Sequence, residues 1–256
     1  MSKRRKFVLI SLVLSLGFIA IQLLDYRYKF IAIAALSVLT LGLFAWALSE
    51  GLGKNATLLT LVLPVIFTAG IGIFWFLLPA NIFTRIPIVI FYGAGVYVLC
   101  LTANIFTVAA VRTIALLRAA RGVGFVLTLL TSFLVFDAIL SLRVLMPLSA
   151  AAIAVFSFPL FVQGLWSVDL TTKLSKEIIN YSLVSALVMG EIAACLHFWP
   201  VTVVVGSLFL TVALYMLLGL GQAKAEGRLF SQTIREYLLV VGLVFIGMFI
   251  ATHWGG

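Results

Sequence analysis

The chain is poor in charged residues, which make up 10% of its 256 residues, whereas hydrophobic residues make up 64%. Soluble domains carry about 25% charged and about 45–50% apolar residues. A soluble protein of this size could not hide so much apolar surface, because much of its surface must face water. A bilayer removes this constraint, since it is itself an apolar solvent. The composition therefore predicts an integral membrane protein and excludes an ordinary soluble domain.

Cysteine and histidine are also scarce, with two residues of each type. Cys100 and Cys195 form no CxxC pair and no disulfide framework, so we interpret them as small apolar core residues. Cys195, His197 and His253 are residue types that bind zinc, but their spacing is not that of a recognised cluster. The sequence accordingly predicts neither a metal site nor a cofactor.

Long apolar runs dominate what is present. A transmembrane helix needs about 20 mostly apolar residues, and runs of that length favour helices over the short alternating segments of a membrane barrel. We therefore predict an all-α bundle of about nine spans, organised as one transmembrane domain over residues 1–256 with no separate soluble domain. The predicted spans are residues 7–24, 30–48, 58–78, 88–111, 123–142, 144–166, 178–199, 201–220 and 237–254.

The first of these runs also has the opening of a signal peptide, because four basic residues, Lys3 to Lys6, precede it. The run is long for the apolar part of a signal peptide, and no clear small-residue cleavage site ends it. We interpret it as a retained first transmembrane helix.

Lysine and arginine are distributed unevenly between alternate loops, which predicts the orientation. With the N-terminus in the cytoplasm and the C-terminus outside, 13 of the 17 basic residues lie on the inner side. This arrangement is typical of a multi-pass protein of the plasma membrane. The four on the outer side are Arg27, Lys29, Arg85 and Arg143.

The tryptophans fall near the ends of the predicted spans, where an amphipathic indole prefers the membrane interface. Trp46 and Trp166 lie near inner ends, and Trp75, Trp199 and Trp254 lie near outer ends. Their placement supports the predicted span boundaries.

The loops are short, which limits the function classes. The longest predicted loop covers residues 221–236, and it is too small for a nucleotide-binding domain. The net charge of +9 would suggest nucleic acid in a soluble protein, but here the basic residues lie between apolar runs. Anionic lipids on the cytoplasmic face are therefore the expected partner, and nucleic acid is not.

Two acidic residues, Asp137 and Glu191, fall inside predicted spans. An ionisable group in hydrocarbon is expensive, so it normally faces the bundle interior and marks a functional site. Both positions lie roughly 9–12 Å below the predicted outer helix ends. The sequence therefore indicates a buried acidic site in the outer half of the bundle, which the two acids could share because they lie at similar depth.

The span that carries Glu191 has two recognisable strips. Cys195 and, roughly, Asn180 share the face of Glu191, whereas residues 186, 190 and 194 form a small-xxx-small pattern that permits close helix packing. We predict from this pattern that the span is buried within the bundle.

Other polar residues could complete the outer site and bind a cation, a proton or a polar head group. The candidate substrate- or ion-binding residues are Asp137, Glu191, Arg143, Arg85, His197 and Asn104. In the alternative, structural interpretation, each acid only makes an interhelical contact, and Asp137 pairs with Arg143 or Arg85. Asn104 would then bond a neighbouring helix.

Three arginines, Arg112, Arg118 and Arg121, are interleaved with apolar residues in a predicted inner loop. They could lie along the interface as a short amphipathic helix and contact lipid phosphates. A role in setting topology explains the same residues.

Three functions remain open. A transporter or lipid-handling carrier would use Asp137 and Glu191 as its polar centre. A membrane assembly or structural protein would use its polar residues for helix packing, with a membrane-protein partner or a second copy. An intramembrane enzyme acting on a lipid-linked substrate needs clustered polar groups, which are few here, so the sequence favours a non-enzymatic role.

Overall fold

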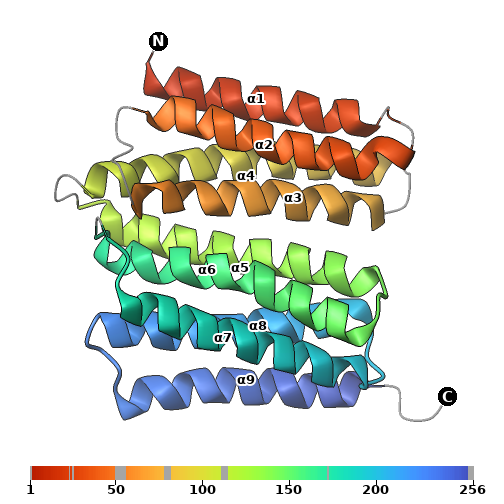
Figure 1. The fold of residues 1–256 in the computed structure, drawn as a ribbon, viewed down its shortest axis with the longest axis vertical. Helices are drawn as coiled ribbons and strands as arrows, with labels where there is room; N and C mark the ends of the chain where they lie inside the picture. The colour runs from red at the N-terminus through yellow and green to blue at the C-terminus, as the bar shows by residue number, and fades with distance from the viewer. Residues whose placement is uncertain are drawn as a thin grey trace. The chain divides into compact units, whose positions relative to one another are not determined.

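A computed structural model describes residues 2–22, 24, 26–49, 56–77, 82–110, 115–171 and 173–252. These residues form helices and no strand (Figure 1). Two short 3-10 helices, η1 (Tyr26–Tyr28) and η2 (Ala56–Leu61), precede α2 and α3. The α-helices are α1 (Lys3–Gln22), α2 (Lys29–Leu48), α3 (Val62–Leu77), α4 (Ile82–Ala109), α5 (Leu117–Ser141), α6 (Met146–Asp169), α7 (Lys176–His197), α8 (Val203–Ala225) and α9 (Ser231–Ala251).

Eight helical segments of the described chain are long and apolar enough to cross a membrane, and they correspond to α2 through α9. This result confirms the predicted all-α bundle of a multi-pass membrane protein. The remaining helix, α1, begins with four basic residues before its apolar run. That α1 is a ninth span, and that the N-terminus lies inside, stay predictions.

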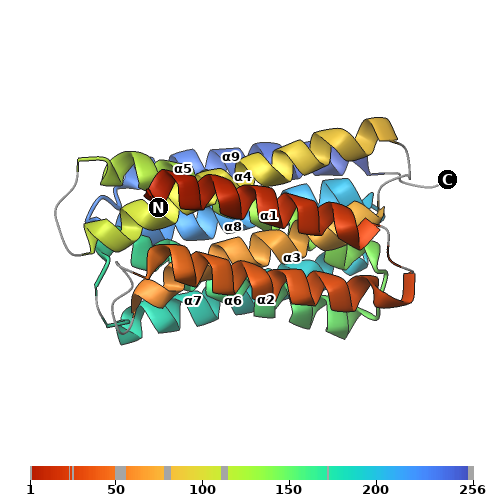
Figure 2. The ribbon, with the colours of Figure 1, turned by 90° about the horizontal axis from the view of Figure 1, so that it is seen from above.

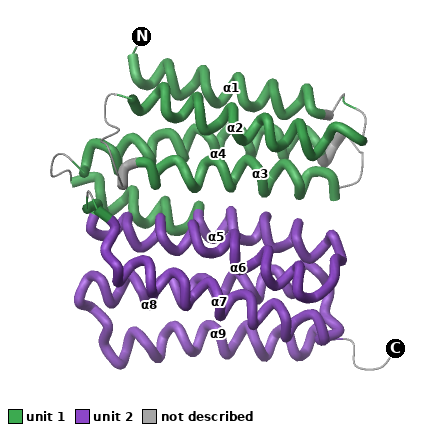
Figure 3. The backbone as a smooth tube through the Cα atoms, viewed as in Figure 1, with its two compact units in different colours: residues 1–127, 170–173 green, residues 128–169, 174–256 purple. Residues whose placement is uncertain are grey.

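The chain divides into two compact units (Figure 3). Unit 1 comprises residues 1–127 and 170–173, and unit 2 comprises residues 128–169 and 174–256. Helix α5 contributes its first part to unit 1 and its second part to unit 2. The hydrophobic pattern, which treats the chain as one transmembrane domain, contains no sign of this division.

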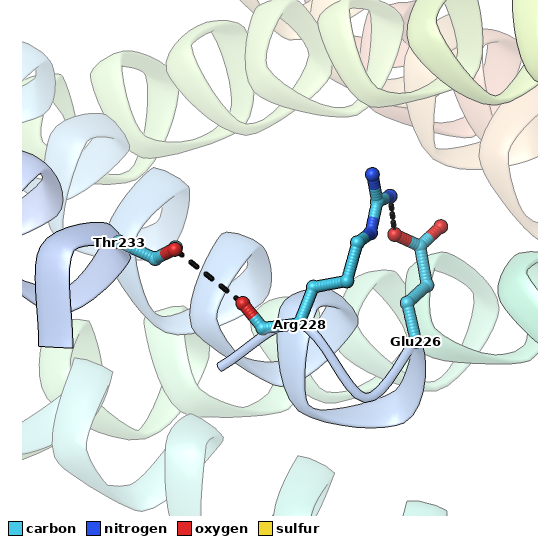
Figure 4. Close-up of polar contacts among 3 residues, drawn as sticks. All are labelled: Glu226, Arg228 and Thr233. Carbon is cyan, nitrogen blue, oxygen red and sulfur yellow. Dashed lines mark hydrogen bonds and ion pairs between the residues drawn. The ribbon is translucent and has the colours of Figure 1, made fainter. Parts of the chain in front are cut away.

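The helices extend further into the loops than the apolar runs do. The predicted loop 221–236 is wrong in its length, because α8 continues to Ala225 and α9 begins at Ser231. Polar residues outside the hydrocarbon continue the backbone hydrogen bonding of a helix, whereas span prediction counts only apolar residues. The short turn that remains contains a contact between Glu226 and Arg228, and Thr233 Oγ1 donates a hydrogen bond to the Arg228 carbonyl at 3.4 Å (Figure 4).

Capping and backbone geometry set the turns of unit 2. The Ser175 hydroxyl accepts a hydrogen bond from the Ile178 amide at 3.2 Å and so caps α7. Thr202 caps α8 in the same way. Arg143, in the turn before α6, has a φ of 48°, in the left-handed region that non-glycine residues rarely adopt. The one-residue gaps between the predicted spans at residues 143 and 200 correspond to short turns in the structure.

Unit 1 is held together by a buried polar chain among aromatic rings. The Thr40 hydroxyl of α2 donates to Thr68 Oγ1 of α3 at 3.3 Å, and Thr68 shares a hydrogen bond with the Tyr92 hydroxyl of α4 at 3.1 Å. The Phe18 ring of α1 stacks on Tyr92 with centroids 4.8 Å apart. One contact cluster thus joins four helices.

In unit 2, α6 and α7 run side by side and pack closely (Figures 1 and 2). Gly190 lies at a close contact with α6: a Cβ atom there would lie 3.1 Å from the Ala150 carbonyl oxygen and 3.2 Å from Ala154 Cβ. The predicted role of Gly190 in close helix packing is confirmed, and its partner helix is α6.

The tryptophans differ in environment despite their similar positions in the sequence. Trp46 is exposed near the end of α2, but Trp75 and Trp166 are buried. Trp199 Nε1 donates a hydrogen bond to Thr252 Oγ1 at 2.8 Å. Trp75 and Trp166 lie within three residues of the ends of α3 and α6, as predicted, and other side chains bury both rings. That the tryptophans lie at a membrane interface stays a prediction. Trp254 and His253 lie outside the described residues.

Candidate functional site

Asp137 lies in the second half of α5 and is buried, with 4% of its surface exposed. The Ser207 hydroxyl of α8 donates a hydrogen bond to Asp137 Oδ1 at 3.2 Å. The same hydroxyl lies 3.0 Å from the Val204 carbonyl, so it can serve one acceptor at a time. The structural alternative paired Asp137 with Arg143 or Arg85, but its partner among the described residues is Ser207. Asp137 thus joins α5 to α8 in a packed interior.

Glu191, in contrast, is exposed on α7. The neighbouring Gly190 faces α6, and this contact fixes the rotation of α7 so that Glu191 points away from α6. The expectation that this span is buried on the Glu191 side, and that Glu191 belongs to a buried site with Asp137, is wrong. The sequence correctly put Asn180 and Cys195 on the face of Glu191, and both are exposed with it. The interpretation of Cys195 as a core residue is therefore wrong, whereas Cys100 is buried.

The other outer-site candidates are distributed over both units. Arg143 and His197 are exposed in unit 2, and the His197 ring contacts Phe198. Arg85 and Asn104 are half-buried in α4 of unit 1, where the Arg85 guanidinium lies 5.8 Å from the centroid of the Trp75 ring. Their predicted role in binding a substrate or an ion stays a prediction.

The arginines proposed to contact lipid phosphates are partly described. Arg118 and Arg121 lie in the first turns of α5, so they belong to a long helix and not to a separate interfacial one. Arg118 is exposed and Arg121 is half-buried. Arg112 lies outside the described residues. An exposed arginine at a helix end is compatible with a lipid phosphate contact, which remains an expectation.

A pocket of about 220 Å³ lies at the other end of unit 2, between the C-terminal ends of α6 and α8 and the N-terminal end of α7. In the predicted orientation, these are the cytoplasmic ends of the three helices. The residues that line the pocket are Leu165, Asp169, Ser175, Glu177, Ile178, Tyr181, Gly221, Lys224 and Ala225.

The floor of the pocket is built by close helix packing. A Cβ atom at Gly221 would lie 2.7 Å from the Tyr181 ring and 2.8 Å from the Leu165 side chain, so only glycine lets α8 approach this closely. The Tyr181 hydroxyl donates a hydrogen bond to the Leu217 carbonyl at 2.7 Å. Gln222 Nε2 donates to a carbonyl of α6 at 2.9 Å. These two bonds hold α7 and α6 to α8 just behind the pocket.

The rim of the pocket is charged. Lys224 Nζ lies 3.0 Å from Glu177 Oε1, but both side chains are more than half exposed, so this ion pair contributes little to stability. Asp169, also exposed, adds a second carboxylate to the lining. The lining of the pocket thus combines two acidic residues and one lysine with the apolar side chains of Leu165 and Ile178. A site of this kind can accept an amphiphilic molecule with its head group toward water.

Three buried polar atoms of the described residues lack a hydrogen-bonding partner, and all three lie on α6 and α7: Ser157 Oγ, Gln163 Oε1 and Ser182 Oγ. Gln163 and Ser182 each lie about 9 Å from the helix end that borders the pocket, because each is six residues from that end. Buried polar groups are normally paired, so this pair of atoms gives the pocket end of unit 2 an unusual polarity.

Sequence reasoning missed this pocket. Lys224 falls in the predicted loop 221–236, and Asp169 and Glu177 fall between the predicted spans 144–166 and 178–199, where charged residues are expected. One feature of the sequence pointed to the pocket: two of the eight acidic residues flank the α6–α7 turn, on the predicted cytoplasmic side, where most basic residues lie. No group of three or more His, Cys, Asp or Glu residues that could hold a metal occurs in the described part of the chain.

Comparison with known proteins gives the family. Residues 10–251 match a family described as a protein of unknown function (DUF5656). The chain belongs to the DUF5656 family. No curated protein and no solved structure matches it. The match extends from α1 to the last residue of α9 and includes both units, so the pocket and both intramembrane acids lie within the family region.

Proposed function

We propose that this member of the DUF5656 family is a lipid-handling carrier of the plasma membrane that binds an amphiphile at the inner ends of α6, α7 and α8. The pocket with its charged rim and apolar walls is the observation that carries this proposal. It lies where a membrane helix leaves the hydrocarbon, so a bound molecule would place its chains among apolar side chains and its head group among charges.

The charges of the rim favour a zwitterionic or cationic head group. Lys224 suits a phosphate, and the carboxylates of Asp169 and Glu177 suit an ammonium group at hydrogen-bonding distance from it. An anionic head group without an amine would meet two carboxylates and one ammonium, which is unfavourable. In the predicted orientation, the exposed Arg118 at the start of α5 would attract anionic lipids of the inner leaflet.

The unpaired atoms Gln163 Oε1 and Ser182 Oγ support movement of the ligand beyond the pocket. A carrier needs polar groups inside the bundle that can exchange partners as a head group passes, and these two atoms are buried about 9 Å from the pocket end. A protein that only packed its helices would gain stability by having apolar residues there.

The proposal is tested with soluble, short-chain phosphatidylethanolamine added to the purified protein in detergent. Binding should raise the midpoint of thermal unfolding in a concentration-dependent way. Lys224→Gln and Glu177→Gln should each weaken the binding about tenfold, the loss of one charge-assisted contact. Lys176→Gln is the matched control, because Lys176 is an exposed base on the first turn of α7 that does not line the pocket.

Carrier activity is tested separately in vesicles that contain fluorescent phosphatidylethanolamine. The protein should speed the transfer of labelled lipid between leaflets, and Lys224→Gln should reduce this rate while Lys176→Gln does not. Unchanged binding and transfer in both pocket variants would refute the proposed function.

A second candidate function, membrane assembly, is favoured by the environment of Asp137. The acid is buried and bonded to Ser207 on another helix, which is the arrangement of a residue that specifies helix packing. If the pocket variants have no effect on lipid binding or transfer, assembly becomes the leading function.

A further inference from the structure

The exposed face of α7 carries polar residues among apolar ones. At 100° per residue, Asn180, Val184, Leu187 and Cys195 all lie within about 40° of Glu191 around the helix axis. All five side chains are exposed. We call these five residues the Glu191 strip. It is separate from the pocket, and the inference drawn from it does not rest on the carrier function.

Glu191 is placed deep in the membrane on this strip. Helix α7 has 22 residues and is therefore about 33 Å long, close to the thickness of the hydrocarbon core, which is about 30 Å. Glu191 is six residues from His197, or about 9 Å from the nearer helix end. A glutamate side chain is too short to span that distance, unlike lysine or arginine, which can extend to the interface.

Lipid alone does not satisfy Glu191. The side chain has no hydrogen-bonding or ionic partner among the residues that the structure describes. Hydrocarbon chains offer no donor, so a carboxyl group at this depth is costly and is normally found against protein or a polar cavity. Leu187 and Val184 beside it are suited to packing against another apolar helix.

We propose that the Glu191 strip is the docking surface for a transmembrane helix of another protein, and that this helix presents a lysine or arginine at the depth of Glu191. Charge complementarity selects the occupant. A cation in the partner satisfies the carboxylate, and the apolar residues on either side exclude lipid from the pair.

A second copy of the chain fits less well, because its cations are at the wrong depth. Within the described helices, every lysine and arginine lies within five residues of a helix end. On the predicted outer side, Lys29 and Arg85 are already placed over the Phe76 and Trp75 rings. The other two outer cations, Arg27 and Arg143, are exposed near helix ends, so among the described residues a second copy has no lysine or arginine at the depth of Glu191.

The test uses the full chain in lipid vesicles and a synthetic Leu/Ala-rich transmembrane peptide with one arginine at the depth of Glu191. Energy transfer between a label at the N-terminus of the chain and one on the peptide reports association. The arginine peptide should bind about tenfold more tightly than the same peptide with leucine in place of arginine. Glu191→Gln should abolish this preference.

Two tryptophan variants test whether the peptide binds the Glu191 strip specifically or any exposed apolar surface of the protein. Val184 on the strip and Leu239 on α9 are 60% and 66% exposed, so both substitutions change a comparable, lipid-accessible position. Val184→Trp should weaken binding of the arginine peptide, and Leu239→Trp should not. Circular dichroism and gel filtration check that both variants fold.

Two results would overturn the proposal. One is equal binding of the arginine and leucine peptides, or a preference that survives Glu191→Gln. The other is efficient oxidative cross-linking of Cys195 between two copies in the membrane, lost in Val184→Trp, because a second copy would then occupy the strip. Neither result affects the pocket variants, so failure here is distinguishable from failure of the carrier function.

Discussion

Asp137 and Glu191 show that two acidic residues within apolar helices can have opposite environments. Both are acids within apolar helices of unit 2, yet Asp137 is buried against Ser207 and Glu191 is exposed. The difference arises from helix rotation, since each helix presents a side chain to its neighbour or away from it according to its contacts elsewhere. For α7, the close approach at Gly190 sets that rotation.

Removal of the Ser207 hydroxyl should have a modest effect on stability. Ser207→Ala deletes the hydrogen bond between α8 and α5, so the free energy of unfolding should fall by about 1 kcal/mol. Ser37→Ala is the matched control, because the buried Ser37 hydroxyl donates only within its own helix, to the Ile33 carbonyl. Its effect should be smaller. Titration with sodium dodecyl sulfate in mixed micelles measures the free energy of unfolding of both variants. An equal decrease in the two variants would contradict a special role for the interhelical hydrogen bond.

At the scale of one element, α7 has two different faces. Ala186 is buried and Gly190 lets α6 approach closely, whereas the side chains of the Glu191 strip are exposed. The N-terminal end of the same helix is capped by Ser175 and contributes Glu177 and Tyr181 to the pocket. The contact with α6 therefore positions both the Glu191 strip and the pocket residues Glu177 and Tyr181.

A larger residue at Gly190 should separate α6 from α7. A Cβ atom there meets backbone and Cβ atoms of α6 that cannot rotate away, so Gly190→Ala should lower the free energy of unfolding by about 1 kcal/mol. Gly242→Ala in α9 is the control, because no atom lies within 4 Å of its added Cβ, and alanine favours helix by up to about 1 kcal/mol. In the same unfolding titration, Gly190→Ala should lower the free energy of unfolding and Gly242→Ala should raise it. A change in the same direction for both variants would show that α6 and α7 tolerate separation.

At the scale of the whole molecule, the orientation in the membrane decides from which side a molecule enters the pocket. The pocket is cytoplasmic only if the N-terminus lies inside, which the distribution of basic residues predicts. With the opposite orientation, the same residues would bind a molecule from outside the cell.

Two single-cysteine variants determine the orientation without changing any charge. Leu145 and Leu174 are exposed in the turns before and after α6. In a background with Cys100 and Cys195 replaced by alanine, Leu145→Cys should react with a membrane-impermeant maleimide in intact cells. Leu174→Cys should react only after permeabilisation. The reverse pattern would invert the predicted topology.

The composition and the apolar runs by themselves determined the class, the helical architecture and the approximate position of each helix. They suffice because the bilayer requires about 20 apolar residues and satisfied backbone hydrogen bonds in every span. They also identified Asp137 and Glu191, since charges in hydrocarbon are rare. Periodicity correctly grouped Asn180 and Cys195 with Glu191 on one face.

Only the tertiary structure decided which face of each helix meets protein. In a soluble helix, the apolar stripe marks the buried side, but in a membrane both sides are apolar, so the sequence of α7 carries little information on its rotation. Burial of Trp166, exposure of Glu191 and convergence of Asp169, Glu177 and Lys224 all follow from contacts between helices. Those contacts depend on close packing of specific surfaces, which hydrophobicity alone does not encode.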